Sequence, residues 1–160
     1  MLSRQGTHAE ELVVSSIDRA DPVIMGHILA QHRELHAQLV AMRACLAGPG
    51  RCVAALRESL EHLRDHLRSH FRQEEAGGFL EESIARMPRL SAAARTVMAE
   101  HPALLAELDD LIATLEKADS AASWDRIADA AERFAQHLLD HERNENAVVQ
   151  EGYNEDLGLD

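Results

Sequence analysis

HLRSHFRQEE at residues 66–75 and HLLDHERNE at residues 137–145 carry the same spacing of polar residues in two distant parts of the chain. In each stretch a His is followed four residues later by a second His, and four residues after that by a Glu. Residues four apart lie on one face of an α-helix, about one turn from each other. Each stretch therefore predicts a helix that stacks two imidazoles and a carboxylate on one side, which is a candidate metal site.

The composition favours a single helical domain. A chain of 160 residues is long enough for one domain with a core, but short for two. Its apolar residues are mostly Leu and Ala, while Gly and Pro are few, which favours helices over sheets. The formal charge of −12, from 28 acidic and 16 basic residues, suits a metal cation and is not that of a nucleic-acid-binding protein.

The N-terminal segment and the cysteines bear on location. The N-terminus lacks the continuous apolar run of a signal peptide, and no stretch approaches the roughly 20 apolar residues that span a bilayer. We therefore expect a cytoplasmic protein with no membrane partner. Cys45 and Cys52 flank the turn at residues 48–50. In a reducing compartment unpaired thiols are favoured, although a functional redox pair stays open.

Start and stop signals divide the chain into a lead-in segment at residues 1–20, a folded domain at residues 21–152 and an acidic tail at residues 153–160. Pro102 should kink the third long helix. The four long helices, joined mostly by short turns, predict an all-α, up-down-up-down antiparallel four-helix bundle. The expected helices are 22–46, 51–76, a short one at 79–86, 91–117, and a last one from 120 or 123 to 150 or 151, which ends at Gly152.

The apolar seam of each long helix tests this bundle. Apolar residues recur in alternating steps of three and four along all four helices, as they do in packed bundles. One His interrupts every seam, and one Glu also interrupts the second and the fourth. Alternating helix directions would bring the four histidines to nearly the same level, within about a turn at 1.5 Å per residue. The six interrupting residues are His32, His70, Glu74, His101, His141 and Glu145.

Six polar groups in an apolar core require compensation, because an unpaired buried charge is costly. A hydrogen-bond network between protonated His and Glu is one possible compensation. A metal cluster offsets the cost more completely, and imidazole with carboxylate suits iron, manganese or zinc. Six ligands exceed the need of one tetrahedral zinc ion. We therefore expect two metal ions that share Glu74 and Glu145, with iron preferred over manganese or zinc.

The same residues resemble the hemerythrin-like proteins, the HHE cation-binding family. The matching motifs are QHREL at residues 31–35, HFRQEE at 70–75, EH at 100–101 and HERNE at 141–145, and the likeness covers about residues 21–152. It implies a non-haem di-iron centre, oxo- or hydroxo-bridged, in a four-helix bundle. The six residues of the seams would be its ligands: His32, His70, His101 and His141 as terminal ligands, and Glu74 and Glu145 as bridges.

Two departures separate this chain from the oxygen-carrying hemerythrins. Leu105 stands where they have a second His on the third helix, and Asn146 stands where they have an Asp after the last His. The chain therefore resembles the bacterial type with fewer ligands, and the likeness does not extend to reversible oxygen carriage.

Several polar residues lie beside the seams. His36, His66 and His137 are each one turn from an expected ligand, so we expect supporting or boundary roles, with His36 the first candidate for a fifth nitrogen ligand. Glu75 and Glu142 face off the seams and are expected at the surface. His8, His27 and His62 are expected to be solvated, and Met25, Met42, Trp124 and Phe134 to be core residues.

The leading functional hypothesis is a small di-iron protein that binds or senses oxygen, nitric oxide or peroxide at an open coordination position. Tyr153, the one tyrosine, could approach this position. Two alternatives stay open. The first, implied by the family's range, is an enzyme acting on peroxide or nitric oxide, or in the repair of iron centres. The second is iron storage or a structural metal site.

Overall fold

The computed structural model describes residues 22–48, 50, 52–77, 79–118 and 120–154. Within these ranges the chain is helical and contains no strand, so the all-α prediction is confirmed. The expectations for residues 1–20, and for the side chains of Met25 and Tyr153, lie outside what the structure describes. The helices are α1 (Pro22–Ala47), α2 (Val53–Gly77), α3 (Phe79–Arg86), α4 (Ser91–Leu115) and α5 (Ala121–Asn154), with a 3-10 turn, η1, at Pro88–Leu90.

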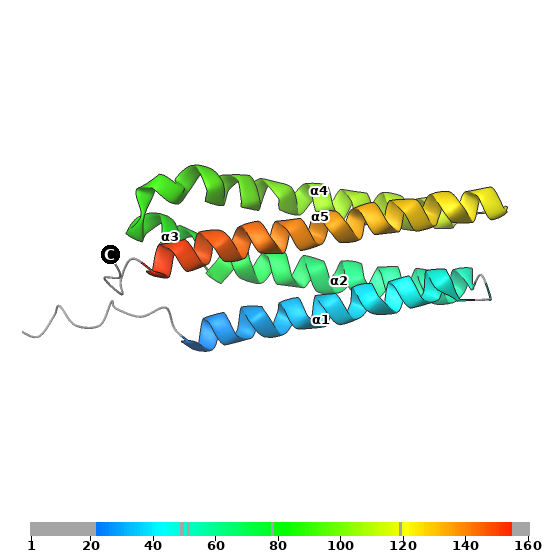
Figure 1. The fold of residues 1–160 in the computed structure, drawn as a ribbon, viewed down its shortest axis with the longest axis horizontal. Coiled ribbons are helices and arrows are strands. Elements are labelled where there is room, and N and C mark those ends of the chain that lie inside the picture. The colour runs from blue at the N-terminus through cyan, green and yellow to red at the C-terminus, as the bar shows by residue number, and fades with distance from the viewer. Residues whose placement is uncertain (1–21, 49, 51, 78, 119, 155–160) are drawn as a thin grey trace, which may run out of the picture.

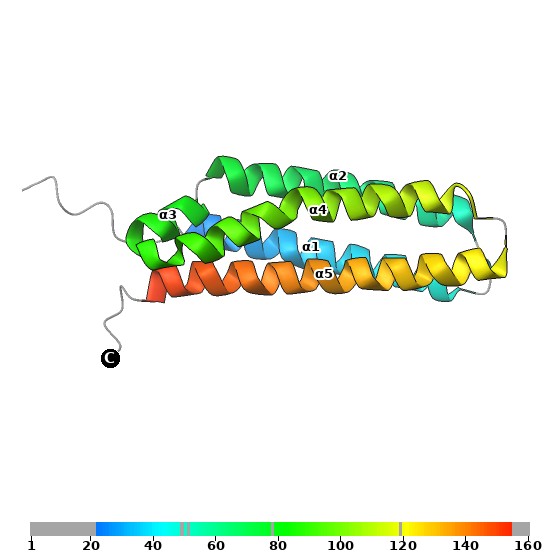
Figure 2. The same ribbon diagram turned by 90° about the horizontal axis from the view of Figure 1, so that it is seen from above.

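The four long helices lie alongside one another. Figure 1 shows α1 and α4 running in one direction along the long axis and α2 and α5 returning in the other. Figure 2 shows the short helix α3 at one end of the molecule, where it contacts the last turns of α5 and the first turns of α4. The described residues thus form a helical bundle with a fifth, short helix across one end.

The helix bounds follow the sequence closely, with one exception. The short helix occupies its expected bounds, and α4 continues through Pro102. However, α5 does not end at Gly152 but continues to Asn154. The reason is packing, because a Cβ built on Gly152 would lie 2.7 Å from the Cβ of Ser83 on α3. This glycine therefore allows two helices to approach closely rather than ending one of them.

Burial follows the predicted seams. The seam residues of α4 and α5 are buried along their length, and so are those of α2 after Val53. Val53 is the exception, at 38% exposed, because it is the first residue of its helix and lies beyond the packed region. Met42, Trp124 and Phe134 are core residues, as expected. Each large apolar side chain buried in this way contributes roughly 1.5–3 kcal/mol.

The core consists of two separate apolar clusters. The larger one fills most of the bundle and includes Leu39, Leu63, Leu108 and Phe134. The smaller one lies at the end covered by α3 and η1, and contains Ile28, Leu80, Met87, Leu90, Ala94, Val97, Val148 and Val149. Along α1, α4 and α5, four of the six expected ligands fall between residues of the two clusters. The other two, His70 and Glu74, lie near the C-terminal end of α2, beyond its residues in the larger cluster or beside them. A polar layer therefore separates two apolar cores.

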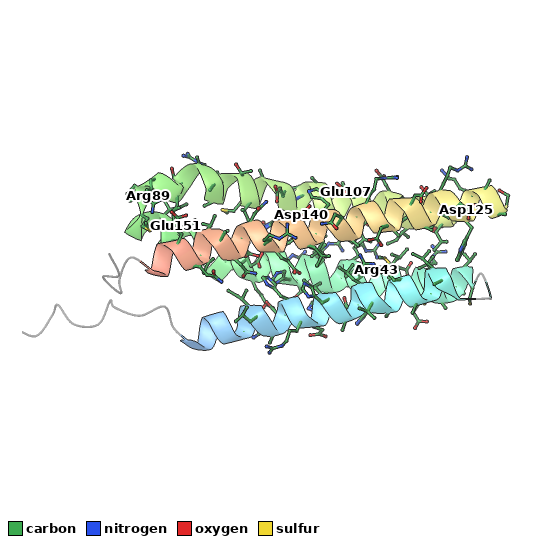
Figure 3. The ribbon with its side chains drawn as sticks, viewed as in Figure 1. Arg43, Arg89, Glu107, Asp125, Asp140 and Glu151 are labelled. Atoms are coloured by element: carbon green, nitrogen blue, oxygen red, sulfur yellow. The ribbon has the colours of Figure 1, made fainter. Side chains whose placement is uncertain are left out.

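Surface ion pairs link neighbouring elements. Figure 3 shows Arg89 of η1 beside Glu151 of α5, with which it forms an ion pair. Arg43 of α1 donates two hydrogen bonds, 2.9 and 2.7 Å long, to Glu132 of α5, and this carboxylate raises the pKa of the guanidinium. Exposed pairs of this kind contribute about 1 kcal/mol or less.

Cys45 and Cys52 are unpaired, as the sequence predicted. None of the described helices is both long and apolar enough to cross a membrane.

Candidate metal centre

All four long helices contribute to the polar layer. His32 comes from α1, His70 and Glu74 from α2, His101 from α4, and His141 and Glu145 from α5. Each of the six residues is at most 5% exposed. Their burial follows from the seam positions, since a residue on the inner stripe of an amphipathic helix is enclosed whatever its polarity.

The donor atoms of these residues form two groups with one member in common. His32, His70, Glu74 and Glu145 each offer one atom, all within 4.8 Å of one another. Glu74 also joins a second group with the other two histidines, under the same distance limit. The second group consists of Glu74, His101 and His141.

Glu74 connects the two groups through its two oxygens. Its Oε1 lies 2.7 Å from Nε2 of His70 and 3.9 Å from Nε2 of His32. Its Oε2 lies 3.5 Å from Nε2 of His101, in the other group. Glu145 has a different position, because its Oε2 lies 3.4 Å from Nε2 of His32 and it belongs to the first group alone. Glu74 therefore has the placement of a bridging carboxylate, while bridging by Glu145 stays a prediction.

The inner atoms of the layer lack hydrogen-bond partners. Among the described residues none is found for Nε2 of any of the four histidines, or for either oxygen of Glu74 and Glu145. Leaving a buried polar group unsatisfied costs about 1–3 kcal/mol. Two cations would compensate all these atoms at once, and imidazole nitrogen with carboxylate oxygen is a donor set that iron, manganese and zinc accept. The residues therefore fit a pair of metal ions.

The outer nitrogen of three of the four imidazoles is held by a side-chain oxygen. In each case Nδ1–H donates to a carboxylate or amide oxygen and leaves the Nε2 lone pair free for a metal, an arrangement that orients histidine ligands in metal sites. For Nδ1 of His32 no partner is found within the described part of the chain. The three pairs are His70–Gln31 at 3.0 Å, His101–Glu75 at 3.0 Å and His141–Glu100 at 2.8 Å.

A comparison with protein families agrees with this geometry. The model of the hemerythrin HHE cation-binding domain matches residues 23–151, from the first turn of α1 to near the end of α5. The chain belongs to the hemerythrin HHE family. No curated protein and no solved structure gave a significant match.

This hemerythrin-family centre has an aromatic wall that the sequence analysis missed. The ring of Phe71 stacks on His101 with centroids 4.0 Å apart and planes 5° from parallel. It also meets His141 edge-on at 5.4 Å. Phe71 directly follows His70, so an aromatic residue next to an expected ligand was the feature of the sequence that could have predicted this contact.

The supporting oxygens were also missed, although their positions carried a signal. Gln31 directly precedes His32, and Glu100 directly precedes His101. Glu75 was expected at the surface, where its side chain is indeed 49% exposed, yet it accepts a hydrogen bond from His101. A polar residue adjacent to a seam ligand points toward the neighbouring helix, where it reaches a ligand of that helix.

The three flanking histidines bond to other side chains and belong to neither metal group. His66 bonds to Gln38 at 3.0 Å and His137 to Glu107 at 2.7 Å. His36 lies with its Nε2 2.5 Å from Oε2 of Glu142. The surface prediction for Glu142 is wrong, since this residue is only 4% exposed. Its face of α5, next to His141, is covered by α1.

Burial and neighbouring side chains shift the pKa values in the polar layer. Burial disfavours a charge on His32, but the nearby carboxylates of Glu145 and Glu74 outweigh it and raise the pKa of this imidazole to about 10. Burial raises the pKa of Glu145 to about 8, against the opposing effect of the nearby His32. Burial opposes ionisation of Glu74 as well, yet the nearby imidazoles of His32 and His70 lower its pKa to about 2. Burial lowers the pKa of His141.

Proposed function

We propose that this hemerythrin-family protein holds two iron ions in its polar layer and binds or senses a small oxidant there, namely oxygen, nitric oxide or peroxide. His32, His70 and Glu145 would hold one ion, His101 and His141 the other, and Glu74 would join both. The proposal includes an up-down-up-down four-helix topology, which the opposite helix directions in Figure 1 support. It also includes a reducing compartment such as the cytoplasm, where Cys45 and Cys52 stay unpaired.

The observation that carries this proposal is the position of Glu74. Its two oxygens face different groups of histidines, at 2.7 Å from His70 and 3.5 Å from His101, and neither oxygen has a hydrogen-bond partner in the part of the chain that the structure describes. A single ion would leave one oxygen and one set of imidazoles uncompensated. Two ions would satisfy both sets, which favours a dinuclear centre.

An iron pair, when bound, supplies stored electrons and coordination positions for an exogenous ligand. The chain's own residues define what can reach it. The second group offers three donors where the first offers four, so the side of His101 and His141 is the more open one. The ring of Phe71, which belongs to the larger apolar cluster, contacts both histidines and gives this side an apolar wall. Such surroundings favour small, weakly polar molecules over charged substrates.

The decisive measurement combines elemental analysis with optical spectra of the purified protein, recorded before and after dithionite and then air. We expect two iron ions per chain and a visible absorption that disappears on reduction and returns with oxygen. Addition of nitric oxide or azide should change the spectrum. A protein that contains only zinc, or whose iron spectrum does not respond to any of these molecules, would contradict the proposal.

A second candidate is an enzyme that consumes peroxide or nitric oxide. The three-donor group favours it, because fewer protein ligands leave more room for a substrate. Turnover assays with either molecule distinguish the two functions: consumption above that of free iron favours the enzyme, and its absence favours binding or sensing. Iron loading that stops at two ions per chain would exclude storage.

A further inference from the structure

A surface groove runs along α5 where this helix meets α1. Its volume is about 480 Å³. His36 lines it from α1, while Glu142, Asn146 and Gln150 line it from α5 at successive turns. Residues four apart share one face of a helix, so these three side chains form a row of oxygen donors opposite one imidazole.

Glu142 is the unusual member of this groove. It is 4% exposed, and its Oε2 lies 2.5 Å from Nε2 of His36, whose side chain is half-exposed. Its other oxygen, Oε1, is buried with no hydrogen-bond partner within the described residues. A buried carboxylate with one oxygen unpartnered is under-compensated. A cation in the groove would complete its environment.

The chemistry of the donors selects the kind of cation. One imidazole nitrogen, a carboxylate and the amide oxygen of Asn146 suit a first-row divalent metal, and the small number of protein donors favours weak, exchangeable binding. Arg143 also lines the groove, but its Nη1 donates to Asp140 at 2.6 Å, so its charge is paired with that of Asp140. Figure 3 labels Asp140 about midway along α5.

The position of the groove suits a site through which ions enter the buried centre. The metal centre is almost fully enclosed, so an ion must pass through a wall of the bundle to reach it. His36 lies one turn from His32 on α1, and Glu142 directly follows His141 on α5. Helices α1 and α5 also pack against each other less extensively than α4 and α5 do. The groove thus places one half-exposed imidazole and one buried carboxylate beside a loosely packed wall of the centre.

We propose that His36, Glu142 and Asn146 form a third, weak site for a divalent metal, through which ions reach the buried pair. This role rests on the proposed function, because it requires a dinuclear centre to be loaded. The weak site itself is independent of it.

The test compares wild-type protein with His36→Ala and Glu142→Gln, using His62→Ala as a matched control that removes an exposed imidazole from α2. Manganese binding to the metal-loaded proteins, followed by electron paramagnetic resonance, should reveal one weak ion in wild type and in the control. Both groove variants should bind it at least about tenfold more weakly, because each removes a proposed ligand and even a group that only orients a ligand typically contributes that much.

Loading of metal-free protein with limiting iron(II) gives the second readout. Both groove variants should load more slowly than the control and still reach the wild-type iron content and optical spectrum. Circular dichroism checks that the variants are folded, and His36→Ala alters only a half-exposed side chain. Unchanged manganese binding would overturn the weak site. Unchanged loading rates, or loss of a tightly held ion from His36→Ala, would overturn the loading role.

The outcomes separate the two proposals. A wild-type protein that holds fewer than two tight ions refutes the dinuclear function and the loading role with it. The weak site is then still judged by the manganese measurement on the same variants.

Discussion

Replacing Glu74 and Glu145 separately gives the sharpest test of the centre. The substitutions Glu74→Gln and Glu145→Gln both keep the size of the side chain and remove its charge. Glu74 belongs to both metal groups, whereas Glu145 belongs only to the group of His32 and His70. We therefore expect metal-loaded Glu145→Gln to keep about one tight ion, held by His101 and His141, and Glu74→Gln to keep almost none.

The magnitude follows from the geometry. The oxygens of Glu74 lie 2.7 Å from Nε2 of His70 and 3.5 Å from Nε2 of His101, so one carboxylate reaches both ion positions. Removing one partner from a buried charge pair costs roughly 3–5 kcal/mol, which weakens binding by roughly a hundredfold to several thousandfold. Glu74→Gln should weaken both ions by such a factor, and Glu145→Gln only one.

The assay is the metal content per chain after dialysis against a weak chelator, supported by calorimetric titration of metal-free protein. His62→Ala serves as the control and should retain both ions, whereas His70→Ala should lose most of its metal. Two retained ions in Glu74→Gln would refute the shared carboxylate. Equal losses in Glu74→Gln and Glu145→Gln would show that both bridge, and the assignment of Glu145 to one group would be wrong.

Further tests probe protonation, support and packing. The pKa of His32 is raised to about 10 and that of Glu145 to about 8, so both groups carry protons at pH 7 that a metal must displace. Metal affinity, measured in competition titrations, should therefore rise from pH 7 to pH 10. Glu100→Gln should lower metal affinity by about 10–100-fold while the content at saturation stays unchanged, since Glu100 orients a ligand rather than binding metal. Gly152→Ala should lower the free energy of unfolding by about 1–3 kcal/mol in denaturant titrations, because its Cβ would lie 2.7 Å from that of Ser83.

The sequence predicted the inner faces of the helices well because they depend on a local rule. A residue on a repeat of three and four is turned inward whenever its helix packs in a bundle. This rule placed His32, His101 and the other four ligand candidates in the core, where the structure has them. The bounds of α3 were also predicted, from its place in the connection before Pro88.

Features that depend on a neighbouring helix could not be obtained in this way. Glu142 and Glu75 occupy similar positions beside a seam, yet Glu142 is buried against α1 and Glu75 is half-exposed. The difference arises from which helix covers each side, and periodicity within one helix does not contain it. The prediction that the last helix ends at Gly152 was wrong for the same reason, since the role of this glycine depends on Ser83 of α3 rather than on its own helix.

The division of the interior into two apolar clusters would couple the stability of one end of the bundle to metal binding in the polar layer. The smaller cluster, which includes Leu80 and Val148, is separate from the larger one, and the layer of histidines and acids lies between them along α1, α4 and α5. Without cations the uncompensated polar groups of this layer would weaken the packing between the clusters, and bound cations would strengthen it. Gain or loss of metal would then change how firmly α3 and the ends of α1 and α5 pack against the bundle. Metal binding at the buried layer would thereby alter the surface at that end of the molecule.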